Sequence, residues 1–146
     1  MLLSVLLATS CGGQDRDTDG KQVTAEVSAE VEQFLTEQVD GGSFNDRGQL
    51  TVVGASTVTV TVEEFSFEPT VLVGAPDQEL TVVLTNVGDG PHTFTIDEQE
   101  VDVALRRGQS GQATVTFPSS DATILFYCRF HRDLGMVGAL TLSPPT

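Results

Sequence analysis

The sequence predicts an all-β fold, namely an antiparallel β-sandwich or barrel of about seven to eight strands. From about residue 50 onward, apolar and polar residues alternate with a period of two, which indicates strands buried on one face. The alternating segments are short, and turn-forming Gly, Pro, Asp and Ser separate them. No long helix and no internal repeat is predicted in this region, so the strands must cover one another in two layers.

Length and charge limit the possible partners. The chain has 146 residues, which fits one domain with an appendage rather than two domains. Its formal net charge of −14 would repel phosphates, so neither nucleic acid nor an anionic membrane surface is expected as a partner. No stretch reaches the roughly 18 to 20 apolar residues that span a bilayer. We expect a monomer with basic or small partners.

The N-terminus, MLLSVLLATSCGG, is a short apolar run that ends in small residues before Cys11. This pattern resembles a bacterial lipoprotein signal, in which the cysteine is lipidated and becomes the mature N-terminus. Two features differ: no Lys or Arg precedes the run, and Ala8 stands where Leu is commoner. A buried N-terminal strand is the alternative, but the polar QDRDTDG soon follows. We expect residues 1–11 to direct export to the periplasm or the outer face of the cytoplasmic membrane, with a lipid anchor.

Residues 12–49 are expected to form an acidic linker, because they are polar and rich in Gly, Asp, Gln and Thr. Within them Val27, Val31, Phe34 and Leu35 recur at helical spacing and predict a short amphipathic helix. Such a helix would either dock a partner or act as a spacer between membrane and domain, and we favour the spacer.

The domain, residues 50–146, opens with STVTVTVE, and the segments ELTVVLTN, HTFTI, QATVTF and GALTL continue the same period. Side chains two residues apart point to the same face of a strand. Three faces follow from this rule, each with one sulfur or imidazole side chain at a strand end: His92 with Phe94 and Ile96; Cys128 with Ile124 and Phe126; and Met136 with Gly138, Leu140 and Leu142.

The segment FYCRFHRDLGM brings three possible metal ligands together, with the spacing Cys128-x2-His131-x4-Met136, and His92 lies 36 residues before Cys128. A thiolate and two imidazoles can hold copper in a trigonal arrangement, with a thioether as a long axial contact. If Cys11 carries lipid, Cys128 is the only thiol left, and an exported free thiol calls for a metal, a nucleophilic role or deep burial. A chance meeting of both histidines, this cysteine and this methionine is the less favoured explanation.

These segments resemble the cupredoxins, the blue copper electron carriers, over about residues 56–144. GPHTFTIDEQE followed by FYCRFHRDLGM is similar to the plastocyanin-like members in particular. The resemblance implies a Greek-key sandwich and one mononuclear type 1 copper, bound by His92, Cys128, His131 and, axially, Met136. It also implies a protein that carries single electrons, with a cytochrome or a membrane oxidase or reductase as partner.

Two positions depart from the family pattern. The family often has Asn directly after the first histidine and a small residue such as Ser after the cysteine, where this chain has Thr93 and Arg129. These residues brace the metal loop in the family by hydrogen bonds. The ligand set is unaffected, but the surroundings that tune the reduction potential are expected to differ.

The resemblance also suggests a docking surface. His131 would be the ligand nearest solvent and the route for electrons, with Phe130 and Leu134 as an apolar contact surface. Arg129 and Arg132 add positive charge beside it, either for docking or as mere charge balance.

A second candidate surface is the run DEQEVD, which places Asp97, Glu98, Glu100 and Asp102 close together. Some plastocyanins carry an acidic run at the corresponding place and dock a basic cytochrome with it. We interpret the run as a patch that steers a cationic redox partner, with a merely solvated acidic face as the alternative.

Three other functions are compatible with parts of this sequence. A copper carrier or store without a redox partner would use the same ligands. A cysteine nucleophile would use Cys128 and His131 with Asp133, but these lie on one tight loop on the buried side. A metal-free binding sandwich would ignore copper. We expect no catalytic turnover, because a multicopper oxidase needs further histidine pairs and a binuclear centre needs two cysteines in the loop.

Overall fold

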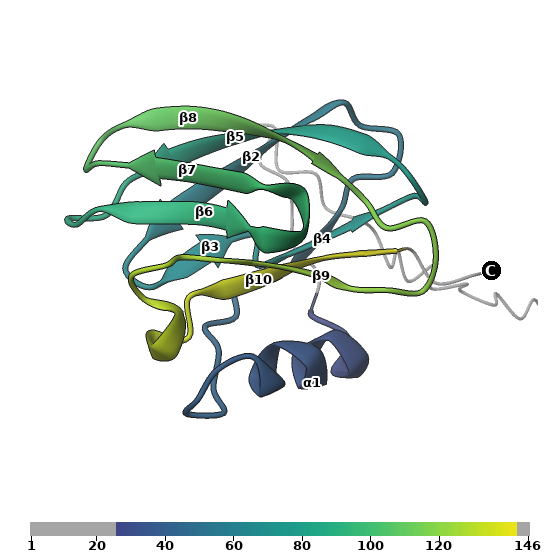
Figure 1. The fold of residues 1–146 in the computed structure, drawn as a ribbon, viewed down its shortest axis with the longest axis horizontal. Coiled ribbons are helices and arrows are strands. Elements are labelled where there is room, and N and C mark those ends of the chain that lie inside the picture. The colour runs from purple at the N-terminus through teal and green to yellow at the C-terminus, as the bar shows by residue number, and fades with distance from the viewer. Residues whose placement is uncertain (1–25, 143–146) are drawn as a thin grey trace, which may run out of the picture.

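Two sheets make up most of the molecule, which a computed structural model describes over residues 26–142 (Figure 1). The predicted signal at residues 1–11, including Cys11, and residues 12–25 of the predicted linker lie outside the described residues. One sheet has six strands in the order β1 (Gln49–Thr51), β4 (Val71–Gly74), β10 (Val137–Leu142), β9 (Ile124–Tyr127), β6 (His92–Ile96) and β7 (Val101–Leu105). The other has four strands in the order β3 (Ser66–Glu68), β2 (Thr57–Glu63), β5 (Glu79–Asn86) and β8 (Ser110–Thr116).

The predicted all-β fold class is confirmed, with ten strands in the described residues where about seven to eight were expected. The short strands β1 and β3 have three residues each, too few to show a period of two. The pairs β1–β4, β4–β10 and β2–β5 are parallel, although antiparallel pairing was expected throughout. Alternation reports which face of a strand is buried, and it carries no information on the direction of the neighbouring strand.

The main core lies between the two sheets. Alternate residues of β2, β5 and β8 point into it from one side, and alternate residues of β4, β6, β9 and β10 point into it from the other. These side chains include Val58, Val60, Val62, Leu80, Val82, Leu84 and Val115, facing Leu72, Phe94, Ile96, Phe126 and Leu140. Cys128 and Met136 belong to the same cluster, so the predicted buried faces are confirmed.

The predicted helix is α1 (Ala29–Glu37), and it packs on the domain. Its buried face, Val31 and Leu35, forms a second apolar cluster with the outer side of the six-stranded sheet, notably Val71 and Val137. Figure 1 shows the helix lying outside the sandwich, alongside β9 and β10. Residues 27–39 are therefore part of the packed domain, where the sequence alone suggested a linker with a spacer helix.

Two short 3-10 helices complete the described secondary structure, η1 (Asp97–Gln99) after β6 and η2 (Arg132–Leu134) between β9 and β10. Across the part of the chain that the structure describes, every helix is too short or too polar to cross a membrane.

Strand order brings the predicted ligands to one end of the sandwich. β9 pairs antiparallel with both β6 and β10, so the start of β6, the end of β9 and the start of β10 lie at the same end of the sheet. His92 is the first residue of β6, Cys128 directly follows β9, and Met136 directly precedes β10. Residues far apart in the chain are therefore held together by the sheet, before any metal is considered.

Candidate metal centre

Three predicted ligands converge at the end of the sandwich where β6 and β10 begin and β9 ends. His92 Nδ1 lies 3.2 Å from His131 Nδ1 and 4.0 Å from Cys128 Sγ, and His131 Nδ1 lies 3.5 Å from the same sulfur. His92 and Cys128 are fully buried, and His131 is half-buried. These residues form the His-Cys-His cluster of the structure, in which all the candidate ligand atoms lie within 4.8 Å of one another.

The triangle has the size that a metal ion requires. A point equidistant from three atoms with these separations lies about 2.1 Å from each, and first-row metal ions keep about 2.0 to 2.3 Å from imidazole nitrogen and thiolate sulfur. Two nitrogens and one sulfur in a plane form a donor set that suits copper in both of its oxidation states. The residues present therefore fit the trigonal copper site that the resemblance implies.

Met136 is fully buried next to this cluster. Its backbone N–H donates to the carbonyl of His131, and its own carbonyl accepts the N–H of Cys128, at 3.2 Å and 3.1 Å. The tight loop from Cys128 to Met136 is closed by these two bonds, which keep the backbone of Met136 beside the backbones of Cys128 and His131. Its role as axial ligand stays a prediction.

Thr93 connects the ligand strand to the ligand loop. Its backbone N–H donates to Cys128 Sγ at 3.4 Å, and its Oγ1 accepts the backbone N–H of Arg129 at 2.8 Å. The same hydroxyl lies 3.0 Å from Thr95 Oγ1, and Thr95 donates in turn to Asp102 Oδ1. A threonine thus braces the metal loop at the position where the family often has asparagine.

His131 lies between apolar rings. The ring of Phe65 is 4.7 Å away between centroids, and the ring of Phe130 is 6.3 Å away. Burial, and secondly the neighbouring His92, lower the pKa of His131 below its ordinary value. The neutral imidazole, which is the form that binds a metal, is therefore favoured.

One residue of the site was missed by the sequence analysis. Glu64, in the turn after β2, places Oε1 3.0 Å from His92 Nε2, the ring nitrogen that faces away from Cys128. Nothing in the segment VEEFSF marks this glutamate, because its contact with His92 spans 28 residues and depends on how β2 and β6 face each other.

The predicted docking residues beside His131 are of two kinds, namely exposed apolar side chains and an arginine that is bonded to another part of the chain. Phe130 and Leu134 are 54% and 55% exposed beside His131, as an apolar contact surface requires. A hollow of about 660 Å³ adjoins Phe130, and His92, Arg106 and Arg107 are among its other lining residues. Arg132 is less free than the sequence suggested, because its side chain bonds to Gln38 after α1.

The acidic run lies at the far end of β6 from His92, because it begins at η1, where that strand ends. Glu98 and Glu100 are exposed there. Asp97 accepts a hydrogen bond from Tyr127, and Asp102 forms an ion pair with Arg129 at 2.9 Å, so neither of these two charges stands alone.

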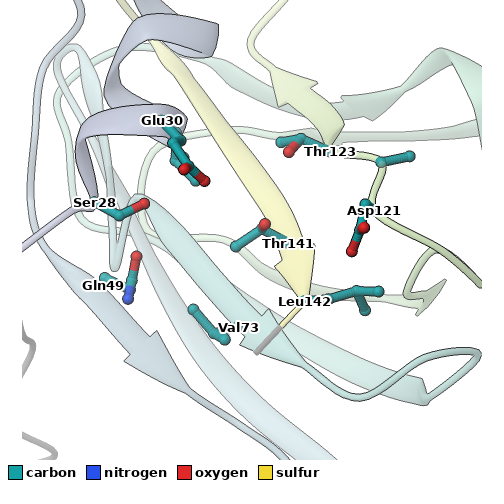
Figure 2. A pocket seen from close by; sticks show the side chains of 10 residues that line it. Ser28, Glu30, Gln49, Val73, Asp121, Thr123, Thr141 and Leu142 are labelled. Carbon is teal, nitrogen blue, oxygen red and sulfur yellow. The ribbon is translucent and has the colours of Figure 1, made fainter. Parts of the chain in front are cut away.

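A second cavity, of about 530 Å³, lies away from this centre (Figure 2). Ser28 and Glu30 at the start of α1 line it together with Asp121 and with Leu142 at the end of β10. Its lining contains no residue of the cluster just described.

Comparison with known proteins agrees with this architecture. A family model described as "Cupredoxin-like domain" matches residues 47–142. Auracyanin from the photosynthetic bacterium Roseiflexus castenholzii is 18% identical with a TM-score of 0.52, and the match covers 62% of this chain and 98% of that chain. None of the curated proteins matches in sequence.

Two further solved structures share the fold. One is the metal-binding domain of the Cu(I)-exporting P-type ATPase CopA of Streptococcus pneumoniae D39, with 8% identity, a TM-score of 0.54, and 68% and 100% of the two chains covered. The other is the laccase-like multi-copper oxidase CueO of Ochrobactrum sp., with 13% identity, a TM-score of 0.50, and 69% and 30% covered. Because these proteins differ in role, the fold by itself does not select one.

Proposed function

Because this chain belongs to the cupredoxin-like domain family, we propose that it is an extracytoplasmic, mononuclear blue-copper protein that carries single electrons between redox partners. The observation that carries the proposal is the triangle of His92 Nδ1, His131 Nδ1 and Cys128 Sγ, with sides of 3.2, 3.5 and 4.0 Å. Copper would supply a one-electron Cu(II)/Cu(I) couple there, with Met136 as the axial ligand.

The protein's contribution is to keep the ligand atoms still. His92, Cys128 and Met136 are fully buried at the ends of paired strands, and backbone hydrogen bonds close the loop that joins the last two. A close-packed interior resists displacement of its side chains. The same ligand positions therefore serve both oxidation states, which keeps the reorganisation that accompanies electron transfer small.

Electrons would enter and leave through His131. It is the ligand with the largest exposure of the three in the cluster, and Phe130 and Leu134 surround it with exposed apolar surface. An apolar patch beside a ligand ring lets a partner approach closely without removing water from charged groups.

Copper titration tests the proposal directly. Adding Cu(II) to the metal-free protein should give an intense blue or green colour from thiolate-to-copper charge transfer. Cys128→Ser should abolish the colour, whereas Cys11→Ser, which changes the other cysteine of the chain, should leave it intact. Met136→Leu should keep the colour and raise the reduction potential, because Cu(II) is less well stabilised once the axial sulfur donor is lost. A wild-type protein that stays colourless in excess Cu(II) would overturn the proposal.

A copper carrier or store is the second candidate function. The similar CopA domain was solved with Cu(I), and a carrier would use the same ligands. The burial of Cys128 and Met136 favours electron transfer, since a carrier must expose its ligands to hand the metal over. Retention of copper through repeated oxidation and reduction supports the electron carrier, and ready loss of copper on reduction supports the metal carrier.

We do not propose catalytic turnover. Cys128 has no exposed surface, so a substrate has no direct access to its sulfur. The described residues contain one His-Cys-His cluster, and an oxidase of the multicopper type needs additional histidine pairs.

For the partner, we propose a cationic redox protein such as a cytochrome, steered by exposed Glu98 and Glu100. The association rate with a basic cytochrome should fall as salt is added, and Glu98→Gln with Glu100→Gln should weaken that dependence. The double variant Glu30→Gln with Glu32→Gln, on α1, removes the same charge elsewhere and serves as the control. A rate that is independent of salt would contradict steering.

We further propose that the protein is exported and anchored through lipid on Cys11, which the small residues before it and the following Gly12 favour. Mass measurement of the N-terminal peptide from membrane-extracted protein tests this. A peptide that begins at lipidated Cys11 supports the anchor, and an unprocessed Met1 contradicts it.

A further inference from the structure

Among residues 26–142, Glu64 is the one carboxylate with a hydrogen-bond contact to a metal-ligand candidate. Its Oε1 lies 3.0 Å from Nε2 of His92, whose side chain is fully buried, while the glutamate side chain itself is 34% exposed. The same oxygen accepts the backbone N–H of Gly90 at 2.7 Å. The carboxylate therefore connects the turn after β2 to the imidazole that begins β6.

This contact decides which nitrogen of His92 is available for a metal. A glutamate side chain is ionised at neutral pH and can only accept hydrogen bonds, and Oε1 of Glu64 already accepts the backbone N–H of Gly90. In the neutral imidazole the N–H must then be on Nε2, which faces Glu64. The lone pair is left on Nδ1, which faces His131 and Cys128.

The position of Glu64 is itself fixed by the surrounding turn. Asn86, which is fully buried, accepts the N–H of Gly88 and donates to the carbonyls of Gly90 and Leu105, at 2.9, 2.9 and 3.0 Å. This turn passes so close to Glu64 that a Cβ added to Gly88 would lie 2.5 and 2.6 Å from its two carboxylate oxygens. The carboxylate is thus held in a close-fitting pocket of the backbone, although part of it reaches solvent.

We propose that Glu64 is a positioning residue of the copper site, which holds the proton of His92 on Nε2 and, by its negative charge, lowers the reduction potential of the metal. The inference rests on the proposed function, since it concerns copper bound at His92. A carboxylate hydrogen-bonded to a ligand imidazole orients the ring and makes it a stronger donor. The added electron density stabilises Cu(II) more than Cu(I), because Cu(II) carries the larger charge.

The first test measures the potential of copper-loaded variants. In Glu64→Gln the amide oxygen can still accept from Nε2 and from Gly90, but the charge is lost. We expect Cu(II) affinity to fall about tenfold relative to Cu(I) affinity, which equals a rise of about 59 mV in potential. Glu63→Gln is the matched control, because it removes the same charge at the neighbouring residue. The carboxylate of Glu63 pairs with Arg47.

Two outcomes of this test overturn the inference. An unchanged potential in Glu64→Gln would show that the charge has no effect on the metal. An equal rise in Glu63→Gln would show that any nearby carboxylate acts in the same way, and the specific contact with His92 would then be irrelevant.

The second test needs no copper. Nitrogen NMR of the metal-free protein reports which ring nitrogen of His92 carries the proton when the imidazole is neutral. We expect Nε2 in wild type and in Glu64→Gln, and a mixture that includes Nδ1 in Glu64→Ala. A proton on Nδ1 in wild type, or an unchanged tautomer in Glu64→Ala, would overturn the positioning role.

Gly88→Ala separates position from charge, because it keeps the glutamate and pushes its carboxylate away from His92. The potential should rise in the same direction as in Glu64→Gln, and no rise would count against the inference.

Urea unfolding of each variant shows whether the fold is retained. If wild type binds no copper, the proposed function fails. If wild type is blue but the Glu64 variants match the Glu63 control, only this inference fails.

Discussion

At the scale of single residues, the threonine that follows His92 braces the loop that carries Cys128. Thr93 is fully buried, and its hydroxyl accepts the N–H of Arg129, the residue after Cys128, at 2.8 Å. The departure from the family pattern at both positions was visible in the sequence. That Thr93 braces the loop through the backbone N–H of Arg129 became clear only from their contact in the structure.

Replacing Thr93 by Val should destabilise the protein. The change keeps the shape of the side chain but removes the acceptor of the Arg129 N–H. A buried donor without a partner costs about 1 to 3 kcal/mol, and we expect the lower end of this range because the bond is partly buried. Urea unfolding of the metal-free protein measures this. Thr59→Val, at an exposed position of β2, is the control and should change the free energy of unfolding by less than about 0.5 kcal/mol. Equal effects of the two variants would contradict the prediction.

The ion pair of Asp102 with Arg129 should make stability depend on pH in the acidic range. Hydrogen bonds from Arg129, and secondly from Thr95, lower the pKa of Asp102 below its ordinary value of 3.8. A carboxyl whose folded pKa is depressed stabilises the fold above its unfolded pKa, and this contribution disappears as the pH falls through the folded pKa.

We therefore expect wild type to exceed Asp102→Asn in stability by about 0.2 to 1 kcal/mol at neutral pH, a modest value because the pair is half exposed. The difference should shrink below about pH 4. Urea midpoints of both proteins across the acidic range check this. A difference that stays constant down to pH 2 would mean that the ion pair is not its source.

At the scale of elements, α1 and β10 show how the sheet uses both of its faces. Along β10, Leu140 points into the main core, whereas Val137 and Ala139 point outward and are covered by α1. An exposed apolar face on this sheet would invite association with other chains, and the helix removes it. The helix also reaches the metal loop, because Arg132 donates to the carbonyl of Gln38, directly after α1, at 3.1 Å.

Leu35→Ala should show that α1 is part of the stable fold. Leu35 is fully buried between the helix and the sheet, and truncation of such a leucine costs about 2 to 5 kcal/mol. The free energy of unfolding by urea is the measurement, with Glu32→Ala at an exposed position of α1 as the control. A helix that acts only as a spacer predicts no difference between the two variants.

Gly138 is the position of β10 that tolerates no side chain. It pairs with Phe126 of β9, and a Cβ at this position would overlap the ring of Phe126 and the carbonyl oxygen of Thr70. Gly138→Ala should therefore destabilise the protein by about 1 to 3 kcal/mol. Gly41→Ala, where nothing lies within 4 Å, is the matched control for thermal unfolding. Similar melting temperatures of the two variants would contradict this packing argument.

At the scale of the whole molecule, the sandwich joins a rigid metal-binding end to a separate acidic end. The cluster of His92, Cys128 and His131 lies at one end of β6, and η1 with its acidic residues lies at the other. A partner attracted by the acidic end would still have to reach Phe130 and Leu134 for electron transfer. The proposed steering and the proposed electron transfer would therefore be separable properties of the surface, and variants of each can be examined independently.

Copper should stabilise the whole fold, because its ligand atoms come from strands that separate when the chain unfolds. A ligand that binds only the folded state at a hundred times its Kd adds about 2.7 kcal/mol. Urea unfolding with and without copper measures the gain, and Cys128→Ser should lose most of it. Equal stability of loaded and metal-free wild type would contradict a preformed site.

The sequence by itself determined the buried face of each long strand and brought His92, Cys128, His131 and Met136 forward as one ligand set. The buried faces and the three loop ligands follow from local information, since alternation and the spacing of a single loop involve residues close together in the chain. His92 lies 36 residues before Cys128, and the resemblance to the cupredoxins added it to the set. The short strands and the parallel pairing of β2 with β5 could not be read in this way.

Only the tertiary structure decided what surrounds the ligands. The contacts of Glu64 with His92, of Thr93 with Arg129 and of α1 with β10 join segments that are remote in sequence, and the local pattern of one partner does not indicate the other. The physical reason is that such contacts depend on which strand ends meet at one edge of the sandwich. That arrangement is set by the packing of the two sheets against each other, which settles the neighbours of every side chain at once.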